Sequence, residues 1–252
     1  LGTMNFGPHT TEEDSFAIMD RALELGINFF DTANVYGWKL GEGVTEQIVG
    51  RWFAQGGGRR EKVVIATKVY GRMGEWPNES RLSALHIRRA CEGSLKRMKT
   101  DYIDLYQIHW PSKFFSIPRV INQMADAVHE GKIKAVGISN FSVKQMKEAY
   151  YLLAERGIPL ASNQVEYSLL HREPEANGIL ETCRELNVTL IAYMPLRMGA
   201  LTGKYLGQSR PNGLRKRFSP FRNKDLPKLN KIVSLLTEIG SRYSKSPAQV
   251  AL

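Results

Sequence analysis

The sequence predicts an α/β fold built as a (β/α)8 TIM barrel, and three observations support this prediction. Helical and strand patterns alternate in one series along all 252 residues. The strands read as nearly continuous apolar runs, which is typical of parallel strands buried on both faces. No G-x-G-x-x-G sequence follows any strand, which disfavours the rival architecture, a doubly wound open sheet with its dinucleotide fingerprint.

The first half of the chain supplies four expected strands. Thr11 and the acids that follow it predict the start of a helix, which Gly26 ends. The β-branched run KVVIATK predicts a strand soon after three consecutive glycines. The strands expected in this half are residues 1–4, 27–31, 62–68 and 101–109, and the helices are residues 11–25, 43–55 and 80–99.

The second half continues the alternation. Its expected strands are residues 134–139, 159–167 and 188–193, and its helices are residues 118–130, 142–156, 174–186 and 225–243. Pro247 lies at the first turn of one more helix, where proline is tolerated. Because seven strands do not close the usual barrel, we expect the last strand and helix to be absent from this chain. We expect residues 1–252 to form a single domain.

Charge and cysteine content narrow the possible partners. The 35 basic and 25 acidic residues give a net charge of +10, which suits nucleic acid, an anionic membrane or a phosphorylated small molecule. Basic residues alternate with acids on the helix faces, so we expect no nucleic-acid partner. The chain contains no run of about eighteen apolar residues, so we expect no membrane span. Cys91 and Cys183 lie far apart without metal-ligand spacing, which predicts reduced thiols in a cytoplasmic protein and no metal site.

Polar side chains stand at the carboxyl ends of the predicted strands, where barrel enzymes place their chemistry. In chain order they are Asp31 with Tyr36, Lys68, His109, Ser139 with Asn140, Gln164 and Tyr193. Each alone has a structural explanation, since Asp31 could cap a turn, Lys68 could be solvated and His109 could be a core histidine. Their occurrence together at successive strand ends favours one shared site.

The first four of these residues form a coherent proton donor. A phenol has a pKa of about 10, and a nearby ammonium lowers that value. A carboxylate holds the ammonium in place, and a histidine can donate a hydrogen bond to a substrate oxygen. A carbonyl that receives a hydride is such an oxygen, so a nicotinamide cofactor is implied. Amide side chains suit the carboxamide of that ring, and an aromatic face suits stacking against it.

The chain resembles the aldo-keto reductase family in six segments that occur in the family's order: GINFFDTANVYG, VVIATKV, DYIDLYQIHWP, KIKAVGISNFS, ASNQVEYSLL and LIAYMPLRMGALTGKY. The likeness covers nearly the whole chain. It points to the branch that includes potassium-channel β subunits and pyridoxal-reductase-like enzymes of plants and bacteria. It implies reduction of aldehydes and ketones with NADPH rather than NADH. By this resemblance Tyr36 is the general acid, Lys68 and Asp31 tune it, and His109 orients the carbonyl.

The resemblance also implies where the cofactor binds. The residues expected to contact it are Thr3, Met4, Asp31, Ser139, Asn140, Gln164, Tyr193, Met194, Pro195, Leu196, Lys204, Arg210 and Arg215. Met194 departs from the family, which usually has serine there, and Arg197 stands where a small residue is usual. Arg197 either adds a phosphate partner or obstructs the cofactor groove. The family's site for the adenosine 2′-phosphate lies beyond Leu252, so the preference for NADPH depends on resemblance alone.

Three functions remain open from the sequence. The first is a carbonyl reductase, a monomer or weak homo-oligomer, whose small-molecule carbonyl substrate contacts Trp38, Tyr70 and Trp110. These aromatics favour a bulky or flat substrate. The second is a regulatory protein of the channel β-subunit type that binds cofactor with little turnover. Those relatives lack the histidine, whereas this chain keeps His109. The third is another barrel enzyme, acting on a sugar phosphate, in which Lys68 would form a Schiff base.

Overall fold

A computed structural model describes residues 1–37, 40–74, 80–206, 209, 211 and 219–252. Contacts among the described residues form two compact units, and each is treated in turn. The first unit contains Leu1–Gln164 and Thr182–Leu190, and the second contains Val165–Glu181 and Ile191–Leu252. Within the described ranges, no helix is long and apolar enough to cross a membrane.

The strands follow one another across a single sheet in the order β1-β2-β3-β4-β5-β6. Their bounds are β1 Phe29–Asp31, β2 Val64–Val69, β3 Ile103–Ile108, β4 Ile133–Ser139, β5 Leu160–Glu166 and β6 Thr189–Tyr193. Each neighbouring pair from β1 to β5 is parallel. A doubly wound sheet would reverse its strand order partway, so this sequential order confirms the predicted barrel class.

The expected first strand, residues 1–4, is present as a single parallel bridge rather than as a strand. Gly2 bridges to Asp31, and the Asp31 N–H donates to the Leu1 carbonyl at 2.8 Å. Thr3 donates from its N–H to the Asp31 carbonyl at 3.0 Å. The next residues form a turn closed by a bond from the His9 N–H to the Asn5 carbonyl, which ends the extended backbone.

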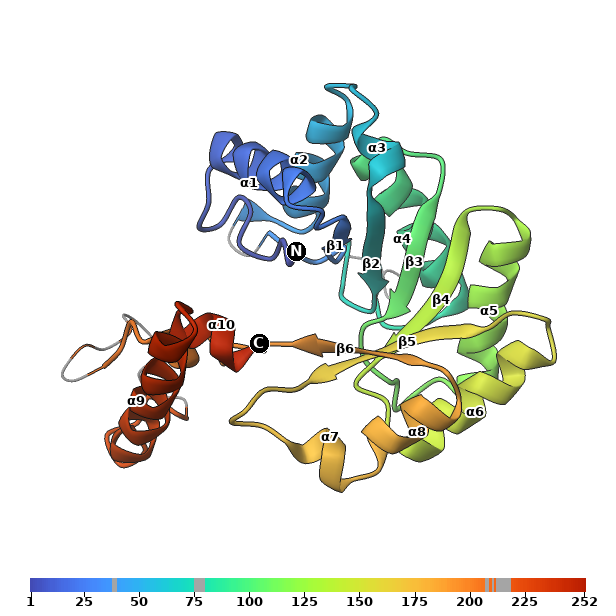
Figure 1. Ribbon diagram of the computed structural model, residues 1–252. Coiled ribbons are helices and arrows are strands. Elements are labelled where there is room, and N and C mark those ends of the chain that lie inside the picture. The colour runs from blue at the N-terminus through green and yellow to red at the C-terminus, as the bar shows by residue number, and fades with distance from the viewer. Residues whose placement is uncertain (38–39, 75–79, 207–208, 210, 212–218) are drawn as a thin grey trace. The chain divides into compact units, whose positions relative to one another are not determined.

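Helices of the first unit follow the strands in the predicted order. They are α1 Glu12–Glu24, α2 Val44–Phe53, α3 Arg59–Lys62, α4 Ala84–Met98, α5 Ile117–His129 and α6 Val143–Ala154. Helix α3 was not predicted, because its four residues are too few to show a helical period. Helices α4 and α5 lie along the same side of strands β2 to β4 (Figure 1).

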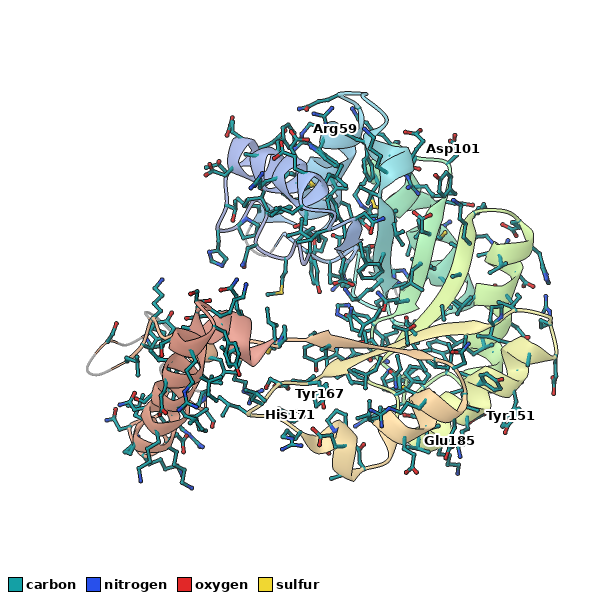
Figure 2. The ribbon with its side chains drawn as sticks, viewed as in Figure 1. Arg59, Asp101, Tyr151, Tyr167, His171 and Glu185 are labelled. Atoms are coloured by element: carbon teal, nitrogen blue, oxygen red, sulfur yellow. The ribbon has the colours of Figure 1, made fainter. Side chains whose placement is uncertain are left out.

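The core of the first unit lies between these helices and the sheet. Its fully buried side chains include Phe30, Ile65, Tyr106 and Ile108 from the strands, and Ile87, Met98, Ile121 and Met124 from the helices. Arg59 and Asp101 lie at the edge where β2 and β3 begin (Figure 2). The carboxyl ends of the strands, which carry the predicted site, form the opposite edge.

The second unit has an apolar cluster of its own. The elements are α7 Glu173–Ala176, the 3-10 helix η2 Ala200–Thr202, α9 Leu226–Arg242 and α10 Pro247–Ala251, and α8 Ile179–Glu185 begins in this unit. The cluster contains Ala200, Tyr205, Phe221, Leu226, Leu229 and Val233. The helix predicted over residues 174–186 is interrupted between α7 and α8, because Gly178 has a φ of 81° that ends helical geometry.

Candidate active site

The structure brings together the four side chains of the predicted catalytic set in the first unit. Asp31 is the last residue of β1, Lys68 is the second-last of β2, and His109 directly follows β3. Tyr36 lies in the turn after β1, where its N–H donates to the Ala33 carbonyl at 3.1 Å. The parallel sheet therefore places all four side chains at one edge, where the strands have their carboxyl ends.

Lys68 is the most enclosed of these residues, with a side chain only 1% exposed. Its ammonium donates to Asp31 Oδ2 at 2.6 Å and to the Thr32 carbonyl at 2.8 Å. A third contact joins Lys68 Nζ to the Tyr36 hydroxyl at 3.4 Å. Because every donor of the ammonium has an oxygen partner, the buried charge is compensated and aimed at the phenol.

The pKa of Tyr36 differs from the expectation based on its neighbours. Burial raises the pKa of Tyr36 above its usual value, while the charge of Lys68 opposes this rise and Asp31 adds to it. The predicted lowering by Lys68 is therefore present but smaller than the effect of burial. The phenol keeps its proton at neutral pH, as a proton donor must.

His109 lies beside Tyr36 as a neutral imidazole. The two ring centroids are 6.1 Å apart with an interplanar angle of 80°. The pKa of His109 is lowered to about 4, mainly by burial, while the charge of Lys68 acts in the same direction and Asp31 in the opposite one. At pH values above this pKa the ring is neutral and has one N–H donor and one acceptor nitrogen. It can thus donate a hydrogen bond without adding positive charge.

Asp31 connects more strands than the sequence indicated. Its Oδ1 accepts hydrogen bonds from Gln164 Nε2 at 2.9 Å and from Gln107 Nε2 at 3.2 Å. Gln107 was not among the predicted site residues. The available signal was a polar residue inside the otherwise apolar strand DLYQIH, since a buried amide requires hydrogen-bond partners.

Ser139 and Asn140 lie at the carboxyl end of β4, next to the end of β5. The Ser139 hydroxyl donates to the Gln164 carbonyl at 2.8 Å, and Asn140 Nδ2 donates to Ser139 Oγ at 2.9 Å. Asn140 Nδ2 also donates to the His109 carbonyl at 3.2 Å. These contacts link the residues predicted to hold a carboxamide to the strand end that carries His109.

Thr3 lies next to Asp31, and Met4 follows it. Thr3 is fully buried, and its hydroxyl donates to the Asp31 carbonyl at 3.0 Å. Met4 is exposed. Among the predicted substrate contacts, Tyr70 directly follows β2, and Trp110 is exposed and stacks on His109 with centroids 6.4 Å apart. Trp38 lies outside the described residues.

The other predicted cofactor contacts belong to the second unit. Tyr193 ends β6, Met194, Pro195 and Leu196 follow it, and Lys204 is exposed. Arg197 forms an ion pair with Glu166, also of this unit. Its guanidinium is therefore already paired with a carboxylate. This pairing competes with both roles considered for Arg197, binding a phosphate and obstructing the cofactor groove. Arg210 and Arg215 fall outside the described residues.

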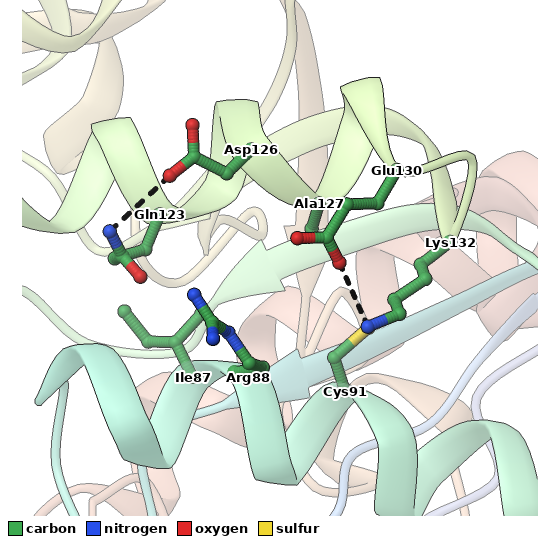
Figure 3. A pocket seen from close by; sticks show the side chains of 8 residues that line it. All are labelled: Ile87, Arg88, Cys91, Gln123, Asp126, Ala127, Glu130 and Lys132. Atoms are coloured by element: carbon green, nitrogen blue, oxygen red, sulfur yellow. Dashed lines mark hydrogen bonds and ion pairs between the residues drawn. The ribbon is translucent and has the colours of Figure 1, made fainter.

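A small pocket lies between α4 and α5 (Figure 3), and none of the predicted catalytic residues lines it. Cys91 lines it, and burial raises the pKa of this thiol to about 12. Lys132 and Glu130 form an ion pair at its rim, 2.8 Å apart. Because nucleophilic cysteines react as thiolates, Cys91 is a structural thiol. Both cysteines are free and buried.

The sequence matches a family model and several known proteins. The family model named "Aldo/keto reductase family" matches residues 1–252. The oxidoreductase YrpG of Bacillus subtilis is 43% identical over 250 residues, which cover 96% of this chain and 75% of that protein. Protein Tas of Escherichia coli is 36% identical over 279 aligned positions, covering 100% of this chain and 80% of the relative. The chloroplastic pyridoxal reductase of Arabidopsis thaliana is 34% identical over 254 residues, with 98% and 67% covered.

Proposed function

Since this chain belongs to the aldo/keto reductase family of oxidoreductases, we propose that it transfers a hydride from NADPH to the carbonyl of an aldehyde or ketone. The observation that carries this proposal is the contact of the Tyr36 hydroxyl with Lys68 Nζ at 3.4 Å, beside the His109 ring. A proton donor, a buried cation and a neutral hydrogen-bond donor then share one strand edge.

Tyr36 supplies the proton in this proposal. The carbonyl oxygen becomes negative as hydride reaches its carbon, and the phenol O–H bond breaks as the proton moves to that oxygen. The phenolate that remains lies next to the ammonium of Lys68, which stabilises the new charge. Asp31 balances the charge of Lys68 throughout. The site returns to its starting charge when solvent reprotonates the phenolate.

His109 orients the substrate. A neutral ring N–H can donate to the carbonyl oxygen and fix its direction relative to the Tyr36 hydroxyl. The low pKa of His109 keeps the ring uncharged, since burial disfavours the imidazolium. This leaves Tyr36 as the acid whose proton is transferred.

The residues present suit a nicotinamide carboxamide. Such a group has an N–H2 donor pair and a carbonyl acceptor, and Ser139, Asn140 and Gln164 offer a hydroxyl and two amides of matching types within one connected set. When bound, NADPH supplies the hydride. Ser139 and Asn140 would hold the carboxamide, and Gln164 would turn part of its amide toward it.

Resemblance to the family is the basis for proposing the remaining cofactor contacts. Tyr193 would stack on the nicotinamide ring, and Met194, Pro195, Leu196 and Lys204 would lie along the phosphates. Because Arg197 forms an ion pair with Glu166, Arg197 is not included among the proposed phosphate contacts. The preference for NADPH over NADH is proposed from family resemblance.

The substrate is proposed to be an aromatic or otherwise flat aldehyde. Exposed Trp110, stacked on His109, and Tyr70 provide flat apolar surface at the same strand edge. The pyridoxal reductase of Arabidopsis is named for a flat aromatic aldehyde. Pyridoxal is therefore one probe, and 4-nitrobenzaldehyde is a second.

The test is the oxidation of NADPH with each aldehyde, followed by absorbance. We expect turnover with the unaltered chain and a loss of kcat of roughly 10²–10⁴-fold in Tyr36→Phe, while NADPH binding measured by fluorescence stays the same. Tyr151→Phe is the matched control, because Tyr151 is exposed on α6. Wild-type turnover in Tyr36→Phe would overturn the assignment of the proton donor.

The regulatory alternative makes the opposite prediction. A channel-β-type protein would bind NADPH tightly and show almost no turnover with either aldehyde. The neutral His109 beside Tyr36 favours the enzyme, because a binding protein has no need for a hydrogen-bond donor next to a buried phenol. Binding without turnover in the unaltered chain would favour the regulatory function.

A further inference from the structure

A single layer of residues crosses the interior side of the sheet at the level of Lys68. In the strand register Lys68 is opposite Gln107, Gln107 is opposite Gly137, and Gly137 is opposite Ser162. The neighbouring positions face the helices instead, as shown by Thr67, whose hydroxyl donates to Glu46 of α2 at 2.6 Å. Gln107 therefore shares one face with the proposed catalytic lysine.

Gln107 occupies this layer at an energetic cost. It is fully buried, and its Oε1 has no hydrogen-bond partner among the described residues. An apolar side chain of similar size would avoid leaving a buried carbonyl unsatisfied. The amide orientation is nonetheless determined, because an ionised Asp31 only accepts hydrogen bonds and must face Nε2. A residue that is costly for stability and aimed at the site suggests a functional role.

The two oxygens of Asp31 have separate partners. Oδ2 receives Lys68 at 2.6 Å, while Oδ1 receives Gln107 from β3 and Gln164 from β5. Two amides from different strands prevent the carboxylate from rotating, since rotation would break both bonds on Oδ1. The direction of Oδ2 then determines where the ammonium of Lys68 can sit.

Gly137 provides the room for this arrangement. A Cβ at residue 137 would lie 2.8 Å from Gln107 Cγ and 2.6 Å from Ser162 Oγ. Both distances are shorter than side chains tolerate. The aliphatic part of the Gln107 side chain therefore passes over Gly137. A Cβ at this position would push Gln107 away from Asp31.

We propose that Gln107 is a positioning residue for proton transfer, which holds Asp31 Oδ1 so that Lys68 stays against the Tyr36 hydroxyl when Gln164 turns to the cofactor carboxamide. This inference rests on the proposed function of Tyr36 and on the proposed contact of Gln164. It assigns to Gln107 the constant bond on Oδ1 and to Gln164 the exchangeable one. Gln107 itself touches neither substrate nor cofactor.

The test compares Gln107→Met with Ser162→Ala in the full chain. Methionine matches the size of glutamine but donates no hydrogen bond. We expect kcat to fall about tenfold, with KM for 4-nitrobenzaldehyde changed by less than about twofold, because a hydrogen bond to a charged group is lost. Ser162→Ala removes another polar group from the same layer, one with no partner on Asp31, and should keep the wild-type rate.

A second readout needs neither cofactor nor turnover. Tyrosine labelled with 13C at Cζ reports ionisation of the phenol by NMR, and Tyr36→Phe identifies the resonance. The pKa of Tyr36 should rise in Gln107→Met, because Lys68 is held less closely to the phenol. It should rise further in Gln107→Glu, which adds negative charge near Asp31. Gln107→Glu also keeps the test valid if the methionine variant does not fold.

The outcomes separate this inference from the proposed function. If Gln107→Met lost only thermal stability, with kcat and the Tyr36 titration unchanged, Gln107 would be structural and the inference would be overturned. If the unaltered chain showed no turnover, the proposed function would fail, and the titration of Tyr36 in the cofactor-free protein would still decide the role of Gln107. A stable, slower Gln107→Met variant with a raised Tyr36 pKa supports the inference.

Discussion

The ammonium of Lys68 lies 2.6 Å from Oδ2 of Asp31, and the lysine side chain is 1% exposed while the aspartate side chain is 19% exposed. The pair is therefore asymmetric, with an enclosed cation and an anion that reaches the edge of the site. An enclosed charge is stable only with its partners in place. This relationship makes Lys68 the residue whose loss should affect stability and turnover together.

Lys68→Met should lower both properties. Removing the cation leaves Asp31 without its charge partner, and we expect the free energy of unfolding to fall by about 3 kcal/mol in urea titrations. The phenol loses the charge that stabilises its phenolate, so kcat should fall by roughly 10²–10⁴-fold. Lys147→Met is the control, because Lys147 and Glu185 are half-exposed and 3.7 Å apart. That variant should change stability by about 1 kcal/mol or less.

Acid should destabilise the protein through His109. The folded-state pKa of about 4 lies below the unfolded value near 6.5. Between these values the unfolded chain binds more protons, so stability present above about pH 6.5 is lost as the pH falls toward 4. Between pH 7 and pH 5 this group alone should cost about 2 kcal/mol. Urea titrations of the unaltered chain and His109→Gln should show a shallower pH slope in the variant, and equal slopes would contradict the assignment.

A buried ion pair between Glu46 and Arg97 joins α2 to α4. Glu46 is fully buried, and it accepts from Arg97 Nε and from the Thr67 hydroxyl, each at 2.6 Å. Arg97→Met should lower the free energy of unfolding by about 3 kcal/mol, because a buried carboxylate is left with one neutral donor. The double variant Glu46→Gln with Arg97→Met should recover part of this loss.

The control for this pair is Arg51→Met. Arg51 binds Glu12 with two bonds of 2.6 and 2.7 Å, yet both side chains are more than one-third exposed. We expect a change of about 1 kcal/mol or less in the same urea titration. Similar losses in Arg51→Met and Arg97→Met would contradict the importance assigned to burial.

Gly137→Ala should disturb the layer that carries Gln107. The added methyl would overlap Gln107 Cγ and Ser162 Oγ, and overpacking of this kind costs about 1–3 kcal/mol. Turnover should fall as well, because Gln107 is pushed from Asp31. Gly93→Ala on α4 is the control, since its new Cβ meets only the end of the Arg97 side chain. That variant should be neutral or gain up to about 1 kcal/mol from helix propensity.

Much of the fold could be predicted because local signals and the sheet agree. Ser142 and Gln145 form a capping box at the start of α6, and Thr11 caps α1 through the Asp14 N–H. The order of the strands follows from their alternation with helices. The interruption at Gly178 was not predicted, because one glycine inside an amphipathic segment does not show whether the helix continues.

The candidate site was predictable only where residues stand at strand ends. Asp31, Lys68 and His109 occupy such positions, so the barrel geometry alone places them at one edge. Gln107 lies inside a strand, where the sequence does not show which interior side chains meet. The raised pKa of Tyr36 was also out of reach, since burial depends on packing around the ring.

The bond from Gln164 to Asp31 joins residues 133 positions apart. Lys68 and Gln107 approach the same carboxylate from two earlier strands, so Asp31 collects its partners in order along the chain. Closing so long a segment costs entropy that short-range contacts cannot offset, and such pairings form slowly. During synthesis Asp31 is made before Lys68, Gln107 and Gln164, and its full set of partners exists only after β5 has joined the sheet. We therefore expect the acid–base site to be completed late in folding, well after α1 and α2 have formed.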